Sequence, residues 1–176
     1  MIRLLRALGA GILILSSVVI LSAVPATAGV TLLSCTGSYH TTYDPGLTYT
    51  PQTVQFSTTN NYTICLLSPP ITSGQSQASG QIPSATCLNL FSGGDSGQTT
   101  VTWNTGQTTT YNWTAVTEEI GGILVDTETG KVVSGKFIGD LVVRTSVTSI
   151  SMIVNGCNTP HGLQNETGTV TLLISG

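Results

Sequence analysis

Charged side chains are scarce in this chain of 176 residues, where Asp, Glu, Lys and Arg together account for 7%. Only five residues are Lys or Arg, and two of these, Arg3 and Arg6, stand at the very start of the chain. A protein with so few positive charges cannot neutralise many phosphates. We therefore predict neither a nucleic-acid partner nor binding to an anionic membrane surface.

Metal-binding and helical patterns are also missing. The four cysteines include none of the short pairs that are typical of zinc sites, and only two histidines are present. No stretch repeats its apolar residues with the 3.6-residue period of an amphipathic helix. These absences predict a protein without a metal or another cofactor, and without a substantial helix.

The N-terminus has the pattern of an export signal. After Arg3 and Arg6, an apolar run extends over residues 7–24, Pro25 ends it, and Ala26-Thr27-Ala28 supplies small residues for cleavage. We predict a signal peptide over residues 1–28 and a single mature domain over residues 29–176, secreted to the extracellular space. The alternatives are a membrane anchor, for which the apolar run is short, and lipid attachment at Cys35, which would leave an odd number of cysteines.

All four cysteines lie in the predicted mature part, and an even number in an exported protein indicates disulfides. Three pairings are possible. We favour Cys35–Cys65 with Cys87–Cys157, because Cys35 and Cys65 are symmetric about residue 50. Turn-forming Pro and Gly residues surround that position, as in an antiparallel hairpin.

Short β-branched runs separated by Gly, Asn, Asp and Pro predict an all-β domain. We place strands at about 30–40, 53–66, 82–91, 98–104, 107–117, 120–127, 131–137, 140–154 and 168–175. Residues 68–84, rich in Ser, Pro, Gly and Gln, are predicted to form a long exposed connection. Two antiparallel sheets with apolar inner faces make an immunoglobulin-like β-sandwich the expected fold.

Residues 99–117 have the clearest pattern. Asn104-Thr105-Gly106 predicts a three-residue hairpin loop that pairs odd residues with odd ones. One face then carries Val101, Trp103, Tyr111, Trp113 and Ala115, and the other carries mainly threonine. We predict that the aromatic face is buried. The alternative is that its aromatic rings form a platform for sugars.

Candidate catalytic residues have weak support. Gly94-Asp95-Ser96-Gly97 resembles the nucleophile loop of chymotrypsin-like proteases, but neither His40 nor His161 has the expected sequence context. Asp126 to Gly130 is predicted to be a hairpin tip, so that Asp126 and Glu128 would be solvated. No catalytic residue is therefore expected.

Several segments resemble a group of small secreted proteins of actinobacteria. They are Cys35-Thr36-Gly37 followed by residues 43–47, residues 102–108, and residues 129–140. The resemblance implies an exported β-sandwich domain with no established activity. It transfers no catalytic or binding residue.

These observations predict a secreted, non-catalytic domain that binds or coats something at the cell surface, with a glycan or a protein as partner. Four tyrosines near the first hairpin are the predicted ligand contacts and are expected to be partly exposed. They are Tyr39, Tyr43, Tyr49 and Tyr62. The alternative function is a carrier or inhibitor that holds a small ligand in a cleft between the sheets.

Overall fold

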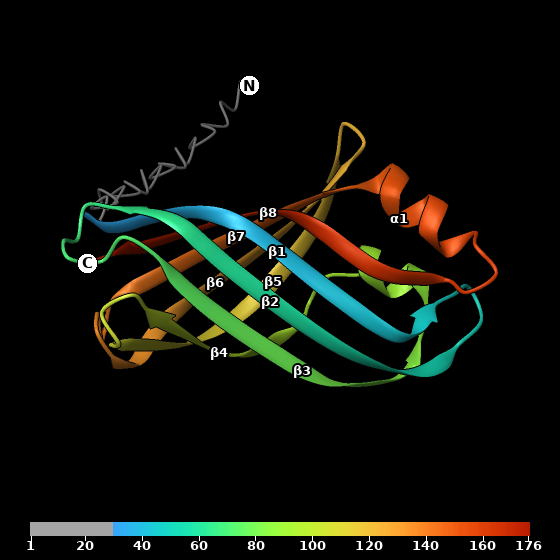
Figure 1. The fold of residues 1–176 in the computed structure, drawn as a ribbon, viewed down its shortest axis with the longest axis horizontal. Helices are drawn as coiled ribbons and strands as arrows, with labels where there is room; N and C mark the ends of the chain where they lie inside the picture. The colour runs from blue at the N-terminus through green and yellow to red at the C-terminus, as the bar shows by residue number, and fades with distance from the viewer. Residues whose placement is uncertain (1–29) are drawn as a thin grey trace, which may run out of the picture.

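The computed structural model describes residues 30–176, which form one antiparallel barrel of eight strands (Figure 1). The predicted signal peptide and its cleavage after Ala28 lie outside the described residues. Each strand pairs with the next in the chain, and β8 pairs with β1. The strands are β1 (Thr31–Leu47), β2 (Gln52–Leu66), β3 (Gly74–Ala85), β4 (Ser96–Trp103), β5 (Thr108–Ile120), β6 (Ile123–Gly135), β7 (Leu141–Ser149) and β8 (Leu163–Ser175).

The predicted immunoglobulin-like sandwich is wrong, because the sheet closes on itself. Strand β1 pairs with β2 on one side and with β8 on the other, from Thr31↔Ser175 to Leu47↔Leu163. A sandwich would leave open edges at these strands, whereas closure satisfies their backbone groups. The all-β, antiparallel character of the prediction is retained.

Three predicted segments have a different structure. The exposed connection predicted over residues 68–84 instead contains most of β3 (Gly74–Ala85), which pairs with β2 from Gln52↔Ala85 to Tyr62↔Gly74. The strand predicted at 82–91 ends early and is followed by a 3-10 helix, η1 (Cys87–Phe91). The strand predicted at 140–154 divides into β7 and a helix, α1 (Ile150–Cys157), which places Ile153 and Cys157 on one buried face.

The hairpin predicted for residues 99–117 is confirmed, and its strands pair in the predicted register. Val101 faces Thr109 across β4 and β5, and Gly106 adopts a positive φ of 78° in the loop. Trp103 is 2% exposed and Trp113 is partly buried. The indoles therefore face the barrel interior, and Thr109 and Thr99 face inward with them. The threonines at the alternate positions, Thr100, Thr102, Thr108 and Thr114, are exposed.

Both predicted disulfides are confirmed, Cys35–Cys65 and Cys87–Cys157. Cys35 and Cys65 are direct partners across the β1–β2 hairpin. Cys87–Cys157 joins η1 to α1, and both elements lie at the barrel end opposite the C-terminus (Figure 1). Two disulfides are compatible with an extracellular protein. Within residues 30–176, no helix has the length and apolarity to cross a membrane.

The barrel interior has two apolar clusters, one toward each end. The cluster near the chain termini contains Trp103, Tyr111 and Ile174, and the cluster near α1 contains Leu47, Leu124 and Ile153. Between them the inward-facing side chains are largely polar, among them Asn60, Glu128, Arg144, Ser146 and Glu166. The candidate site lies in this polar zone.

Candidate functional site

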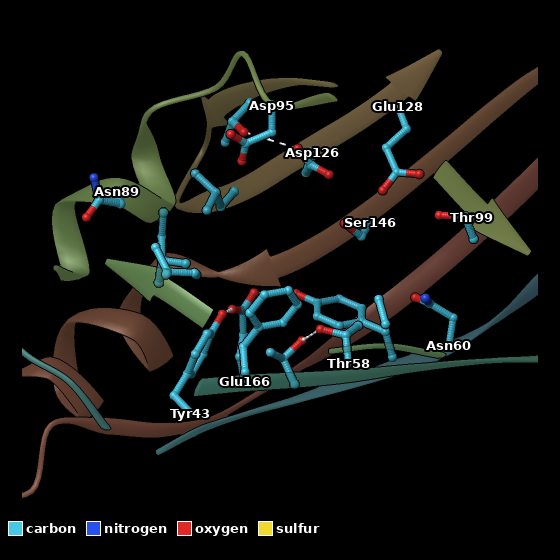
Figure 2. A pocket seen from close by; sticks show the side chains of 18 of the residues that line it. Tyr43, Thr58, Asn60, Asn89, Asp95, Thr99, Asp126, Glu128, Ser146 and Glu166 are labelled. Carbon is cyan, nitrogen blue, oxygen red and sulfur yellow. Dashed lines mark hydrogen bonds between the residues drawn. The ribbon is translucent and has the colours of Figure 1, made fainter. Parts of the chain in front are cut away.

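A cavity of about 630 Å³ occupies the barrel interior on the side of η1. Its walls combine apolar, hydroxyl, amide and charged side chains from most strands of the barrel. Figure 2 shows Asp126 and Glu128 on one wall, with Tyr43, Asn60 and Glu166 on the opposite one. Small-molecule sites in proteins have volumes of roughly 300–1,000 Å³, and this cavity falls within that range.

The cavity reaches the surface where β3 and β4 separate. These strands pair over only three positions, from Gly74↔Trp103 to Ser76↔Val101. Beyond Ser76, β3 continues along β2, while β4 continues along β5 as far as Ser96↔Thr114. Residues from both separated edges line the cavity, including Gln77 and Ala78 from β3 and Thr99 from β4. The incomplete β3–β4 seam is therefore the entrance from solvent.

A polar layer forms the inner end of the cavity; its members are Asn60, Ser76, Tyr111, Glu128 and Arg144. Arg144 on β7 donates from Nη1 to Oε1 of Glu128 at 2.8 Å and from Nη2 to Oδ1 of Asn60 at 2.8 Å. The amide of Asn60 donates to Ser76 at 3.1 Å. Because β2 and β7 are not neighbours in the sheet, this network crosses the barrel and separates the cavity from the apolar cluster beyond it.

The charges of the polar layer depend on one another. Burial disfavours a charged Arg144, but the carboxylate of Glu128 and other nearby groups outweigh this and raise the pKa of the guanidinium. Burial also raises the pKa of Glu128, because the attraction of Arg144 offsets only part of the lost hydration. The pair is a buried ion pair that depends on its hydrogen bonds.

Two tyrosines of β1 share one carboxylate of β8. Tyr39 donates its hydroxyl to Oε1 of Glu166 at 2.6 Å, and Tyr43 donates to Oε2 at 2.8 Å. Burial, and then the nearby carboxylate of Glu166, raises the pKa of both tyrosines above the ordinary value of 10.0. Both phenols therefore remain donors at neutral pH, and both line the cavity.

Two further carboxylates lie nearer the entrance, Asp126 on β6 and Asp95 in the loop before β4. Oδ1 of Asp126 accepts a hydrogen bond from Thr117 at 3.1 Å, whereas Oδ2 lies 3.8 Å from Nη1 of Arg144. Burial raises the pKa of Asp126, and the nearby Asp95 adds to the rise. Asp126 thus keeps one oxygen without a hydrogen-bond donor among the described residues, at the wall of the cavity.

Aromatic rings complete the lining. Phe56 from β2 and Trp113 from β5 join Tyr39 and Tyr43 at the wall. The indole of Trp113 donates to Oγ1 of Thr99 at 2.9 Å, which fixes the ring against β4. The cavity can therefore hold an apolar body against rings while it presents hydrogen-bonding groups at defined points.

The four predicted contact tyrosines are not grouped at the surface. Tyr39 and Tyr43 are buried and line the cavity, while Tyr62 is 1% exposed and lies within the apolar cluster near the chain termini. Tyr49 is 48% exposed in the turn between β1 and β2. The structure brings two of the four together at one site, inside the barrel.

The predicted hairpin tip at Asp126 to Gly130 is wrong, since these residues lie in the middle of β6. Asp126 and Glu128 share the inward face with Leu124. The expectation of a solvated acid is therefore wrong for Glu128, which is buried, whereas the side chain of Asp126 is 32% exposed at the cavity wall. The signal in the sequence that could have shown this shared face is the spacing of two residues between Asp126 and Glu128. On a strand this spacing places both carboxylates on one face.

Arg144, Glu166 and Asn60 were not singled out from the sequence. Arg144 is the only Arg after position 6 and follows three apolar residues in β7, but Arg is mostly exposed in proteins, so the sequence carries no signal that this one is buried. Ser96 lines the cavity, but His40 bonds Asn165 outside it at 3.2 Å and His161 is exposed. No protease-like triad is therefore assembled among the described residues.

Within the described part of the chain, no three His, Cys, Asp or Glu side chains come close enough to hold a metal ion. Comparison of the chain with protein-family models, with curated proteins and with solved structures finds no match in any of the three.

Proposed function

We propose that this protein is an exported binding protein that takes a small molecule into the barrel through the β3–β4 seam. The observation that carries the proposal is the cavity of about 630 Å³, which reaches solvent and is lined by rings and by fixed polar groups. Small eight-stranded barrels either fill their interior with side chains or hold one small ligand. The interior of this barrel is filled toward the chain termini and hollow toward η1.

The arrangement of the tyrosines favours binding inside the barrel over attachment to a surface partner through exposed rings. Tyr39 and Tyr43 direct their hydroxyls to Glu166 within the cavity, and only Tyr49 of the four predicted contacts is largely exposed. The predicted signal peptide and the two disulfides support action outside the cell. We further propose that the site binds without catalysis. No described histidine lines the cavity to activate Ser96. The carboxylate of Glu128 is held by Arg144, and that of Glu166 by two tyrosines.

The test uses three fluorescent probes that share one apolar body, diphenylhexatriene. One is neutral, one carries a trimethylammonium group, and one carries a propionate. We expect at least one probe to bind saturably to the purified protein with one site per chain. Ser146→Phe, which places a ring in the cavity from β7, should weaken that binding at least tenfold.

Thr145→Phe is the matched control, because Thr145 neighbours Ser146 on β7 and does not line the cavity. It should leave binding within about twofold of the unaltered protein. Thermal unfolding of both variants identifies any general loss of structure. Absence of saturable binding for all three probes, or equal binding by the folded Ser146→Phe and Thr145→Phe proteins, would contradict the proposal.

A further inference from the structure

The cavity carries an excess of negative charge. Four carboxylates line it, those of Asp95, Asp126, Glu128 and Glu166, and Arg144 is the one basic residue among the lining residues. The other two basic residues of the described chain, Lys131 and Lys136, do not line it. A cleft lined by one sign of charge concentrates ligands of the opposite sign.

The single positive charge is already used within the protein. Nη1 and Nη2 of Arg144 are directed to Glu128 and Asn60. Glu166 accepts from two tyrosines, which hold its oxygens without cancelling its charge. Asp126 is hydrogen-bonded only through Oδ1, and its Oδ2 is beyond hydrogen-bond distance from Arg144. The charges of Asp126 and Asp95 therefore remain for a ligand to balance.

The walls next to these carboxylates suit the same kind of ligand. Phe56 and Trp113 line the cavity together with Tyr39 and Tyr43. The face of an aromatic ring carries partial negative charge and attracts organic cations. A carboxylic acid or a phosphate would instead meet charges of its own sign at Asp126 and Glu166.

A buried donor at the inner end also lacks a partner. Arg144 is 6% exposed and lines the cavity, yet its Nε makes no hydrogen bond with the described residues. Buried N–H groups without an acceptor are rare in folded proteins. Because the Nε atom itself has almost no accessible surface, it belongs to the polar layer and is not a contact for a molecule in the cavity.

We propose that the cavity binds an organic cation, with its positive group at Asp126 and Asp95 and its apolar body against the aromatic wall. This inference rests on the proposed function, because it names the chemistry of the molecule held in the same cavity.

The three diphenylhexatriene probes separate the two proposals, because they share one apolar body and carry substituents of different charge. The trimethylammonium probe should bind at least tenfold more tightly than the neutral probe, and the propionate probe more weakly than either. Asp126→Asn keeps the shape of the side chain and removes its charge. It should reduce the preference for the cation over the neutral probe to less than threefold, while Asp140→Asn, outside the cavity, preserves that preference.

The comparison of probes on the unaltered protein stands even if Asp126→Asn does not fold. Neutral or anionic probe binding as tight as that of the cation would overturn the cation proposal and leave the binding function intact. An unchanged cation preference in folded Asp126→Asn would also overturn it. Failure of all three probes to bind would reject the binding function itself.

Discussion

Arg144 and Glu128 face each other on neighbouring strands inside the barrel, where Nη1 of the guanidinium lies 2.8 Å from Oε1 of the carboxylate. Each is less than one-tenth exposed. Their direct pairing in the β6–β7 register means that a one-residue slip of either strand would turn its own charge out of the interior and leave the other charge buried without a partner. The ion pair therefore forms at the inner end of the cavity only when β6 and β7 have the observed register.

Arg144→Met should destabilise the protein by about 3–5 kcal/mol, because it leaves the charge of Glu128 buried without its partner. The free energy of unfolding in urea measures this loss. The double variant Arg144→Met with Glu128→Met should lose less than the single variant, since no unpaired charge remains. A double variant less stable than Arg144→Met would contradict this account, and Lys136→Met is the control for removal of a basic residue outside the cavity.

Glu166→Gln should destabilise the fold by about 1.5–3 kcal/mol, the usual range for a hydrogen bond to a charged group. The amide offers one acceptor oxygen where Tyr39 and Tyr43 now use two carboxylate oxygens. The variant should also lower the pKa of both tyrosines toward the ordinary value, because the nearby negative charge is removed. The free energy of unfolding in urea measures the loss of stability, and Glu118→Gln, at an exposed position of β5, should leave that free energy unchanged.

Asp126 should make stability depend on pH in a defined direction. Its pKa is raised by burial in the folded protein, so the native state holds the proton more tightly than the unfolded chain does. The contribution to stability is full below the ordinary value of 3.8 and declines as the pH rises through the raised pKa. Asp126→Asn should therefore be more stable than the unaltered protein at pH 7 and no more stable below pH 3.8. Unfolding curves across this pH range test the prediction, which an Asn variant less stable at pH 7 would contradict.

The Cys87–Cys157 disulfide should hold in place the cap of the barrel, which consists of η1 and α1. It spans 70 residues and links η1 to α1, and replacement of both cysteines by alanine should cost about 2–5 kcal/mol. Because η1 residues line the cavity, the same variant should also weaken probe binding. The matched change at Cys35 and Cys65, at the opposite end, should destabilise the fold while leaving binding in the remaining folded protein unaltered. Equal binding losses in the two double variants would argue against a specific role for the cap.

The closed barrel was not predictable from local pattern, because strands of a sandwich and of a barrel share the same period of two. Closure depends on pairing between the first and last strands, as in Leu33↔Ile174 and Cys35↔Leu172. Strand β3 was missed because its Gly, Ser and Gln residues have low strand propensity. Its hydrogen-bonded pairing with β2 holds this segment as a strand, although its composition does not indicate one.

The orientation of β6 and β7 shows why the site was missed. Apolarity alone would place Ile123 and Val125, and likewise Leu141 and Val143, on the buried face. In the structure, Leu141 is 58% exposed and Val143 is 37% exposed, while Arg144 points inward. Hydrophobicity marks the inner face only where the interior is apolar, and the middle of this barrel is polar.

The sequence alone determined the strand period, the alternation of residues 99–117 and the pairing of Cys35 with Cys65, because each follows from contacts between neighbouring segments of the chain. Tertiary structure alone decided the closure of the sheet, the inward turn of Asp126, Glu128 and Arg144, and the gap between β3 and β4. These features depend on which distant strands meet and on how many side chains the enclosed space can hold. A local pattern of apolar and polar residues shows neither which distant strands pair nor how much space they enclose.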